Sequence, residues 1–129
     1  MARKKETLRV HTIEGVVVIS TMTDFTLSME KVMEDVYEDL CNKGHKKILF
    51  EFHPENYITS AGIAILISLI SEGMKRDQEI GLTGLSDYFK KIFNLIGITR
   101  YTRIYNSLDE ALQKMSEPLS ADRARHVHA

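Results

Sequence analysis

Several features that other protein classes depend on are scarce in this sequence. Its 129 residues include one cysteine, Cys41, so no disulfide framework can form within the chain, and a reducing compartment is favoured. The longest apolar run, Ile63–Ile70, is interrupted by Ser68 and is far too short to span a bilayer. The basic residues near the start are followed by Glu6 rather than by an apolar segment, unlike a signal peptide. These absences predict a cytoplasmic protein.

An excess of one charge is also lacking. The chain has 17 basic and 18 acidic residues and a net charge of −1, so no overall field attracts nucleic acid or an anionic membrane. No phosphate-binding glycine loop is present, because Gly81–Gly84 lacks the length and the lysine. His126 and His128 have no cysteine or carboxylate at ligand spacing. We therefore expect no catalytic residues, no metal and no cofactor.

What the sequence does contain is an ordinary globular composition, with 43% apolar and 27% charged residues. Its length suits one domain with a single core. The periodic pattern begins near residue 7 and fails after Met115, where Pro118 and a mixed polar segment follow. We predict a flexible basic segment over 1–6, a folded domain over 7–116 and a flexible tail over 117–129.

The first third of the pattern predicts a hairpin followed by a helix. A short strand over 8–13 precedes the β-branched run Val16–Ile19, which lacks alternation and should be buried on both faces. Apolar residues at steps of three and four then mark a helix over Met29–Cys41. Ser28 is its candidate N-cap and Gly44 its candidate C-terminal stop.

The middle of the chain predicts a strand, a turn and an unusual helix. Residues 46–52 form a second buried strand, and His53–Asn56 form a turn because proline cannot donate to a strand ladder. The helix over 60–75 is apolar nearly all round. Such a helix is buried on several sides or carries an exposed contact patch.

The last third continues the alternation of strands and helices. Residues 79–83 form a strand, a helix runs from Ser86 to the stop at Gly97, and 101–105 form a last strand. The capping box Ser107–Glu110 opens a final helix. This alternation implies parallel β-α-β crossovers and an α/β layer fold.

Two loops are candidates for function, because binding sites in such sheets gather at the carboxyl ends of strands. They span Thr21–Leu27 and His53–Thr59. The second places adjacent hydroxyls, Thr59 and Ser60, where a turn becomes the apolar helix. A hydroxyl there suits a phosphorylation switch beside the positive end of the helix dipole, although local features alone favour a structural cap. Asp24, in the first loop, would by itself be a turn residue or a carboxylate at a helix start.

The segment Tyr57–Ile63 resembles a family motif. It is similar to the Asp-Ser-(Ser/Ala/Thr)-Gly-Leu motif of STAS domains, in particular those of bacterial anti-sigma factor antagonists. The resemblance covers roughly Leu8–Met115 and includes the segments Tyr88–Ile98 and Ser107–Leu112 in the same order. It implies an α/β STAS fold, with a single mixed sheet of about five strands packed with about four helices.

The resemblance also implies a function without catalysis. In the family, the motif serine is phosphorylated by an anti-sigma factor that acts as an ATP-dependent serine kinase. The unphosphorylated form binds that kinase and frees the sigma factor, and a PP2C-type phosphatase resets the switch. Alignment on the structural glycine Gly62 places the phosphoacceptor at Ser60 and a partner-contacting aspartate at Asp24. The expected role is an anti-anti-sigma factor or a similar partner-switching regulator.

The sequence departs from the family pattern at two places. Thr59 stands where the motif has aspartate, and Thr21–Asp24 replaces the usual Gly-Glu-Leu-Asp. Thr59 is therefore an alternative phosphoacceptor, since some relatives use threonine. Two other functions stay open: an unphosphorylated scaffold or sensory module, and a domain that binds a small ligand such as a nucleotide or a lipid. The expected oligomeric state is a monomer or a weak homodimer.

A phosphate at this position should change docking rather than folding, because a helix N-terminus tolerates negative charge while a partner must desolvate it. We expect Asp24, Thr59 and Ser60 to contact the partner. Apolar side chains around the hydroxyl should supply contact area. They are Met22, Phe25, Ile58, Ile63 and Ile67.

Overall fold

The computed structural model describes residues 7–116. The segments 1–6 and 117–129, which the sequence predicts to be flexible, lie outside the described residues. The histidine pair near the end of the chain, His126 and His128, lies outside them as well. Everything below therefore concerns the predicted folded domain.

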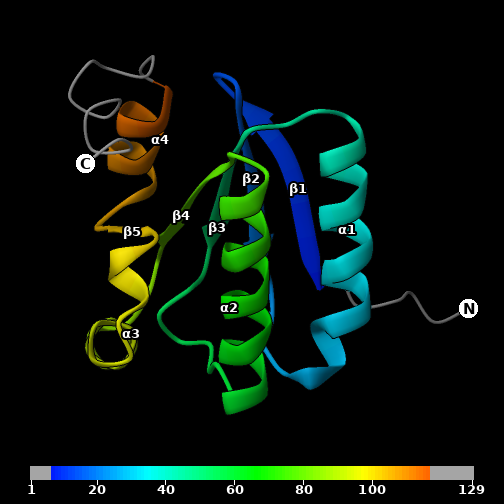
Figure 1. The fold of residues 1–129 in the computed structure, drawn as a ribbon. Coiled ribbons are helices and arrows are strands. Elements are labelled where there is room, and N and C mark those ends of the chain that lie inside the picture. The colour runs from blue at the N-terminus through cyan, green and yellow to red at the C-terminus, as the bar shows by residue number, and fades with distance from the viewer. Residues whose placement is uncertain (1–6, 117–129) are drawn as a thin grey trace, which may run out of the picture.

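One five-stranded sheet forms the centre of the fold (Figure 1). The strands follow one another across the sheet in chain order, with the first pair antiparallel and the other three pairs parallel. Glu14 and Gly15 make the hairpin turn between the first two strands, both with positive φ. The predicted mixed sheet is confirmed. The strands are β1 (Leu8–Ile13), β2 (Val16–Thr21), β3 (Lys47–Glu51), β4 (Glu79–Thr83) and β5 (Arg103–Tyr105).

Within residues 7–116, four α-helices cover the sheet, as predicted, and two short 3-10 helices lie before the first α-helix and after the third. Gly44 and Gly97 have positive φ just beyond the first and third helices, which confirms both predicted stops. The α-helices are α1 (Glu30–Asn42), α2 (Ser60–Lys75), α3 (Asp87–Leu95) and α4 (Leu108–Ser116), and the 3-10 helices are η1 (Leu27–Met29) and η2 (Ile98–Arg100).

The sheet separates two hydrophobic cores. The larger core joins one face of β2–β4 to α1, α2 and α3, and it includes Ile19, Phe50 and Leu66. The smaller core joins the opposite face to α4 through Val18, Leu49 and Met115. Since β2 contributes to both cores, all six of its residues are buried, as its continuous β-branched run predicts. Figure 1 shows α1 and α2 side by side in front of the sheet, with α4 apart from them.

Two local predictions are wrong. Ser28 does not cap α1, because it lies inside η1 and its Oγ is 2.8 Å from Thr26 Oγ1. The last strand is shorter than the predicted 101–105, because Tyr101 and Thr102 close the turn of η2 by donating their N–H groups to the Ile98 carbonyl, and only Arg103–Tyr105 pair with β4. In both places a 3-10 helix precedes the regular element, which therefore begins later than predicted.

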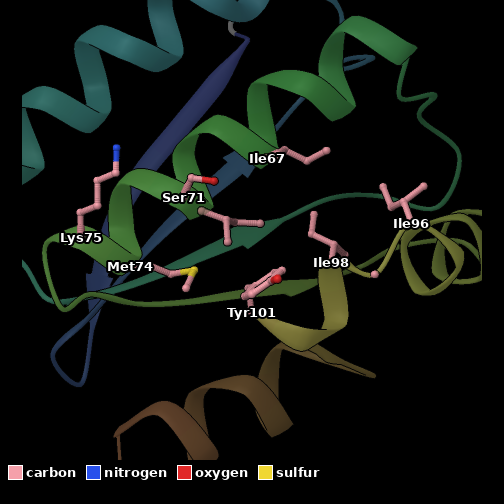
Figure 2. Close-up of a pocket in the computed structure, with 9 residues that line it drawn as sticks. Ile67, Ser71, Met74, Lys75, Ile96, Ile98 and Tyr101 are labelled. Atoms are coloured by element: carbon pink, nitrogen blue, oxygen red, sulfur yellow. The ribbon is translucent and has the colours of Figure 1, made fainter. Parts of the chain in front are cut away.

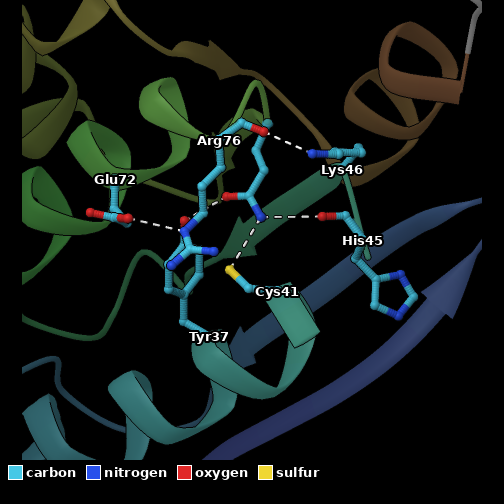
Figure 3. Close-up of polar contacts among 7 residues, drawn as sticks. Tyr37, Cys41, His45, Lys46, Glu72 and Arg76 are labelled. Atoms are coloured by element: carbon cyan, nitrogen blue, oxygen red, sulfur yellow. Dashed lines mark hydrogen bonds and ion pairs between the residues drawn. The ribbon is translucent and has the colours of Figure 1, made fainter. Parts of the chain in front are cut away.

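A polar cluster ties α1 to the segment that follows α2 (Figure 3). The Tyr37 hydroxyl donates to Gln78 Oε1 at 2.5 Å, and Gln78 Nε2 donates to the His45 carbonyl at 3.2 Å and to Cys41 Sγ at 3.4 Å. Burial, assisted by the neighbouring Cys41, raises the pKa of the Tyr37 hydroxyl. The cluster anchors the C-terminal end of α2.

No helix within residues 7–116 is long and apolar enough to cross a membrane. In the same part of the chain, no three His, Cys, Asp or Glu side chains gather where they could hold a metal ion.

Candidate functional site

The two loops that the sequence singled out are joined by backbone hydrogen bonds. The Phe25 N–H donates to the Tyr57 carbonyl at 2.8 Å, and the Thr59 N–H donates to the Phe25 carbonyl at 3.0 Å. Phe25 and Ile58 form an isolated parallel bridge as a result. The loop after β2 therefore holds the loop before α2, and it fixes where α2 begins.

Asp24 strengthens this junction. Its Oδ1 accepts a hydrogen bond from the Tyr57 N–H at 2.8 Å and a longer one from Asn56 Nδ2 at 3.5 Å. The side chain is also exposed. Asp24 thus orients the loop that leads into α2, in addition to presenting a carboxylate on the surface.

The two adjacent hydroxyls have different environments. Thr59 is the N-cap of α2: its Oγ1 accepts from the Gly62 N–H at 3.1 Å and donates to the Phe25 carbonyl at 3.3 Å. Ser60 is the first helical residue, it is exposed, and its hydroxyl makes no hydrogen bond to another described residue. The cap interpretation therefore applies to Thr59, which leaves the Ser60 hydroxyl available.

Gly62 permits the close approach of α2 to the loop after β2. A Cβ at this position would lie 2.4 Å from the Phe25 carbonyl oxygen and 2.8 Å from Phe25 Cδ1. Both distances are far shorter than carbon atoms tolerate, and one neighbour is backbone. A residue with any side chain would push α2, and Ser60 with it, away from the loop.

The predicted apolar surface around Ser60 needs correction. Phe25 and Ile58 are only 1% and 3% exposed, so they form the core beneath the site and cannot supply contact area to a partner. Met22 and Ile63 are half-buried. Ile67 is exposed but lines a groove farther along α2. The prediction is wrong for Phe25 and Ile58, because hydrophobic residues that join two loops are usually packed inward.

Two exposed aromatic side chains were missing from the predicted surface. Tyr57 is 55% exposed and Tyr88 is 61% exposed, and both rings meet the buried Phe89 edge-on, at centroid distances of 5.4 and 5.1 Å. Tyr57 lies three residues before Ser60, and this position was a usable signal. Tyr88 had no such signal, since only packing brings it to the same ring as Tyr57. Exposed tyrosines are enriched at interface hot spots.

The local charge at the start of α2 favours an added anion. No acidic residue occupies the first turn of α2, and its last turn carries Lys75. The positive end of the helix dipole at Ser60 is therefore not offset by a carboxylate within that turn.

Comparison with known proteins assigns the family. The family model for the STAS domain matches residues 7–111, which is most of the chain. The chain belongs to the STAS domain family. The STAS match includes both loops and the whole of α2, so the junction and its hydroxyls lie inside the family's common fold.

Relatives of this STAS domain are named as anti-sigma factor antagonists. A Thermotoga neapolitana homologue of TM1081, provisionally given that name, is 18% identical over 104 residues, which cover 80% of this chain and 92% of that protein. The crystal structure of TM1081 from Thermotoga maritima superposes with a TM-score of 0.74 at 15% identity, covering 85% of this chain and 95% of the other.

A Bacillus relative has been solved in a modified state. The structure of the cell fate determinant SpoIIAA in its phosphorylated form superposes with a TM-score of 0.62 at 14% identity, covering 83% of this chain and 97% of SpoIIAA. At this level of identity the likeness establishes the shared STAS fold.

Proposed function

We propose that this STAS domain is an anti-sigma factor antagonist controlled by phosphorylation of Ser60. In the unmodified state it binds an anti-sigma factor of the ATP-dependent serine kinase type in the cytoplasm, and so releases the sigma factor. Phosphorylation by that kinase ends the interaction, and a PP2C-type phosphatase restores it. The protein acts by binding and carries out no catalysis of its own.

One observation carries this proposal: Ser60 is exposed and its hydroxyl bonds no residue within 7–116, because Thr59 performs the capping. A kinase needs a hydroxyl that can reach its active site without unfolding the substrate. Thr59 is half-buried, and its phosphorylation would remove the hydrogen bond that its hydroxyl donates to the Phe25 carbonyl and place a dianion next to that oxygen. The geometry therefore favours Ser60 over Thr59 as the acceptor.

The electrostatics explain why the switch acts on docking. Phosphorylation adds about −1.5 to −2 charges at neutral pH. At the first position of α2 that charge meets the positive helix end, so the fold should be retained. A partner surface that matches a neutral hydroxyl must then desolvate a dianion, and a penalty of about 1.4 kcal/mol already weakens binding tenfold.

Tyr57, Tyr88 and Asp24 extend the proposed contact surface. The two tyrosines supply exposed aromatic area around Phe89, and Asp24 supplies a carboxylate on the joined loops. In this arrangement the aromatic residues contribute most of the attraction to the partner, and the phosphorylation state of Ser60 determines whether the partner binds.

The direct test uses the full chain, its cognate anti-sigma kinase and Mg-ATP, with phosphopeptide mapping and affinity measurements. We expect one phosphate at Ser60 in the wild type and in Thr59→Ser, which keeps the capping oxygen. Ser60→Ala should accept no phosphate and still bind the kinase. Phosphorylated protein should bind at least tenfold more weakly.

Two results would overturn the proposal. One is a phosphate that maps to Thr59, or that persists in Ser60→Ala. The other is equal affinity of the kinase for the phosphorylated and unmodified chains. Ser60→Ala should unfold at the same urea concentration as the wild type, so lost phosphorylation cannot be ascribed to lost folding.

A further inference from the structure

A groove between α2 and η2 is separate from the Ser60 site (Figure 2). Its volume is about 440 Å³, within the range of about 300–1,000 Å³ typical of small-molecule sites. Its walls are mainly apolar and include Ile67, Met74, Ile96, Ile98 and Tyr101. A concave apolar site with a few polar groups is the usual form of a ligand-binding pocket.

The groove concentrates exposed apolar area. Four of the nine large hydrophobic side chains exposed within residues 7–116 line it, namely Ile67, Met74, Ile96 and Tyr101. Single exposed hydrophobic residues need no explanation, but a contiguous group around a hollow marks a binding surface. The apolar surface that the sequence predicts for α2 is therefore concentrated in its second half.

Lys75 places a positive charge at the edge of the groove. Among the described residues that line it, Lys75 carries the only charge, and its ammonium group has no ion pair or hydrogen bond with a described residue. By contrast, the next residue, Arg76, is paired with Glu72 at 3.0 Å. Figure 2 shows Lys75 at one end of the groove with its ammonium pointing away from the other labelled residues. The side chain is exposed and has no described ion pair, so rotating the ammonium over the groove would break no described contact.

We propose that this groove binds a small apolar monocarboxylate. The carboxylate would pair with the Lys75 ammonium, and the apolar body would cover Met74, Ile98 and the Tyr101 ring. A carboxylate would gain an ion pair with this ammonium that a neutral ligand of the same shape could not form. A second copy of the chain fits less well, because a two-fold interface places the same patch, with the same unpaired cation, on both sides.

The test uses 2-naphthoate as the probe and 2-naphthalenemethanol as its neutral analogue, both titrated into the full chain by NMR. We expect saturable binding with shifts confined to α2 and η2, and naphthoate should bind about two- to fivefold more tightly than the alcohol. Lys75→Gln should remove that difference and leave alcohol binding unchanged. Lys91→Gln, which removes an exposed lysine outside the groove, should change neither affinity.

A second variant tests the groove itself. Ile67→Asp places a carboxylate among the apolar walls and should abolish naphthoate binding, while Leu27→Asp, at an exposed site outside this groove, should not. Thermal unfolding identifies any variant that has lost its fold.

Three outcomes would overturn the proposal: no saturable naphthoate binding, undiminished preference for naphthoate in Lys75→Gln, or a wild-type dimer in light scattering that Ile67→Asp converts to a monomer. The last outcome would identify a second copy as the occupant. None of these results depends on whether Ser60 is phosphorylated.

Discussion

The two ends of α2 present opposite kinds of surface. At the N-terminal end, backbone hydrogen bonds and a capping threonine hold Ser60 in one place, and the chemistry offered is a single hydroxyl. In the C-terminal half, apolar side chains border a groove next to Lys75, which pairs with no described residue. One end can therefore discriminate by whether its hydroxyl carries a phosphate, and the other by the shape, hydrophobicity and charge of what enters the groove.

The separation of the two ends matters as much as their difference. A helix rises about 1.5 Å per residue, so Ser60 and Lys75 begin about 22 Å apart along α2. Charges on the surface are largely screened beyond about 8–10 Å at physiological salt. A phosphate on Ser60 should therefore leave Lys75 unaffected through space, and the two surfaces can be altered separately.

The largest expected effect comes from Gly62→Ala, which disturbs the N-terminal end alone. Alanine normally stabilises a helix by about 1 kcal/mol relative to glycine. Here its Cβ would collide with the Phe25 carbonyl, so we expect a net loss of about 1–3 kcal/mol. Urea unfolding should show a lower midpoint with an unchanged slope.

Gly73→Ala is the matched control in the same helix. Its Cβ would meet Ile80 Cδ1, the end of a flexible side chain that can move, so the loss should be clearly smaller. If Gly62→Ala is as stable as the wild type, α2 does not approach the Phe25 loop as closely as described.

The next effect concerns the anchor at the C-terminal end. Tyr37→Phe removes the hydroxyl that bonds Gln78 and should cost about 1–2 kcal/mol. Because the pKa of Tyr37 is raised in the folded protein, the unfolded chain loses its proton first as pH rises. This contribution to stability is complete below the unfolded pKa of about 10 and is lost above it.

Urea midpoints measured on both sides of that pH provide the check. The wild type should lose stability on the alkaline side more steeply than Tyr37→Phe does. Equal slopes for the two proteins would show that the hydroxyl ionises as readily in the folded state as in the unfolded one.

The third prediction separates the two hydroxyls. Thr59→Ala removes the N-cap of α2 and should cost about 1 kcal/mol, whereas Thr59→Ser should restore most of it. Ser60→Ala should change stability by less than about 0.5 kcal/mol, because its hydroxyl bonds no described residue. A larger loss for Ser60→Ala than for Thr59→Ala would reverse the assignment of cap and acceptor.

The smallest expected effect comes from placing a negative charge at either end of α2. Ser60→Glu adds an anion at the positive end of the helix dipole and should stabilise by about 0.3–1 kcal/mol, while Lys75→Glu should destabilise by a similar amount. Both shifts should shrink in high salt. Thermal unfolding at low and high ionic strength measures them, and shifts of the same sign would exclude the dipole explanation.

Sequence patterns predicted most of the fold because its elements are locally consistent. The continuous apolar run of β2, the three-and-four spacing of α1, and the glycines at 44 and 97 each have a direct physical cause. The 3-10 turns were missed because residues 27–29 and 98–100 carry no comparable signal. Ser28 resembles an N-cap, but it lies inside the 3-10 helix η1, which precedes α1 along the chain.

The sequence located the candidate site, but it did not show which of the two hydroxyls caps the helix and which is exposed. The motif placed two hydroxyls at a helix start, and only the three-dimensional hydrogen bonds show that Thr59 caps while Ser60 is free. Burial also required coordinates, because the motif places both Tyr57 and Ile58 near Ser60 without showing that Ile58 packs inward. The contribution of Tyr88 depends on α3 packing beside a distant loop.

Because α4 packs on the face of the sheet opposite α1 and α2, it provides a place to attach a label. Gln113 is exposed on this helix, and the small core beneath α4 is distinct from the one beneath α1 and α2. A fluorophore or a biotin could be attached through a cysteine substituted for Gln113. It would then lie on the face of the sheet opposite α1 and α2. The chain could then be immobilised with both surfaces of α2 facing the solution.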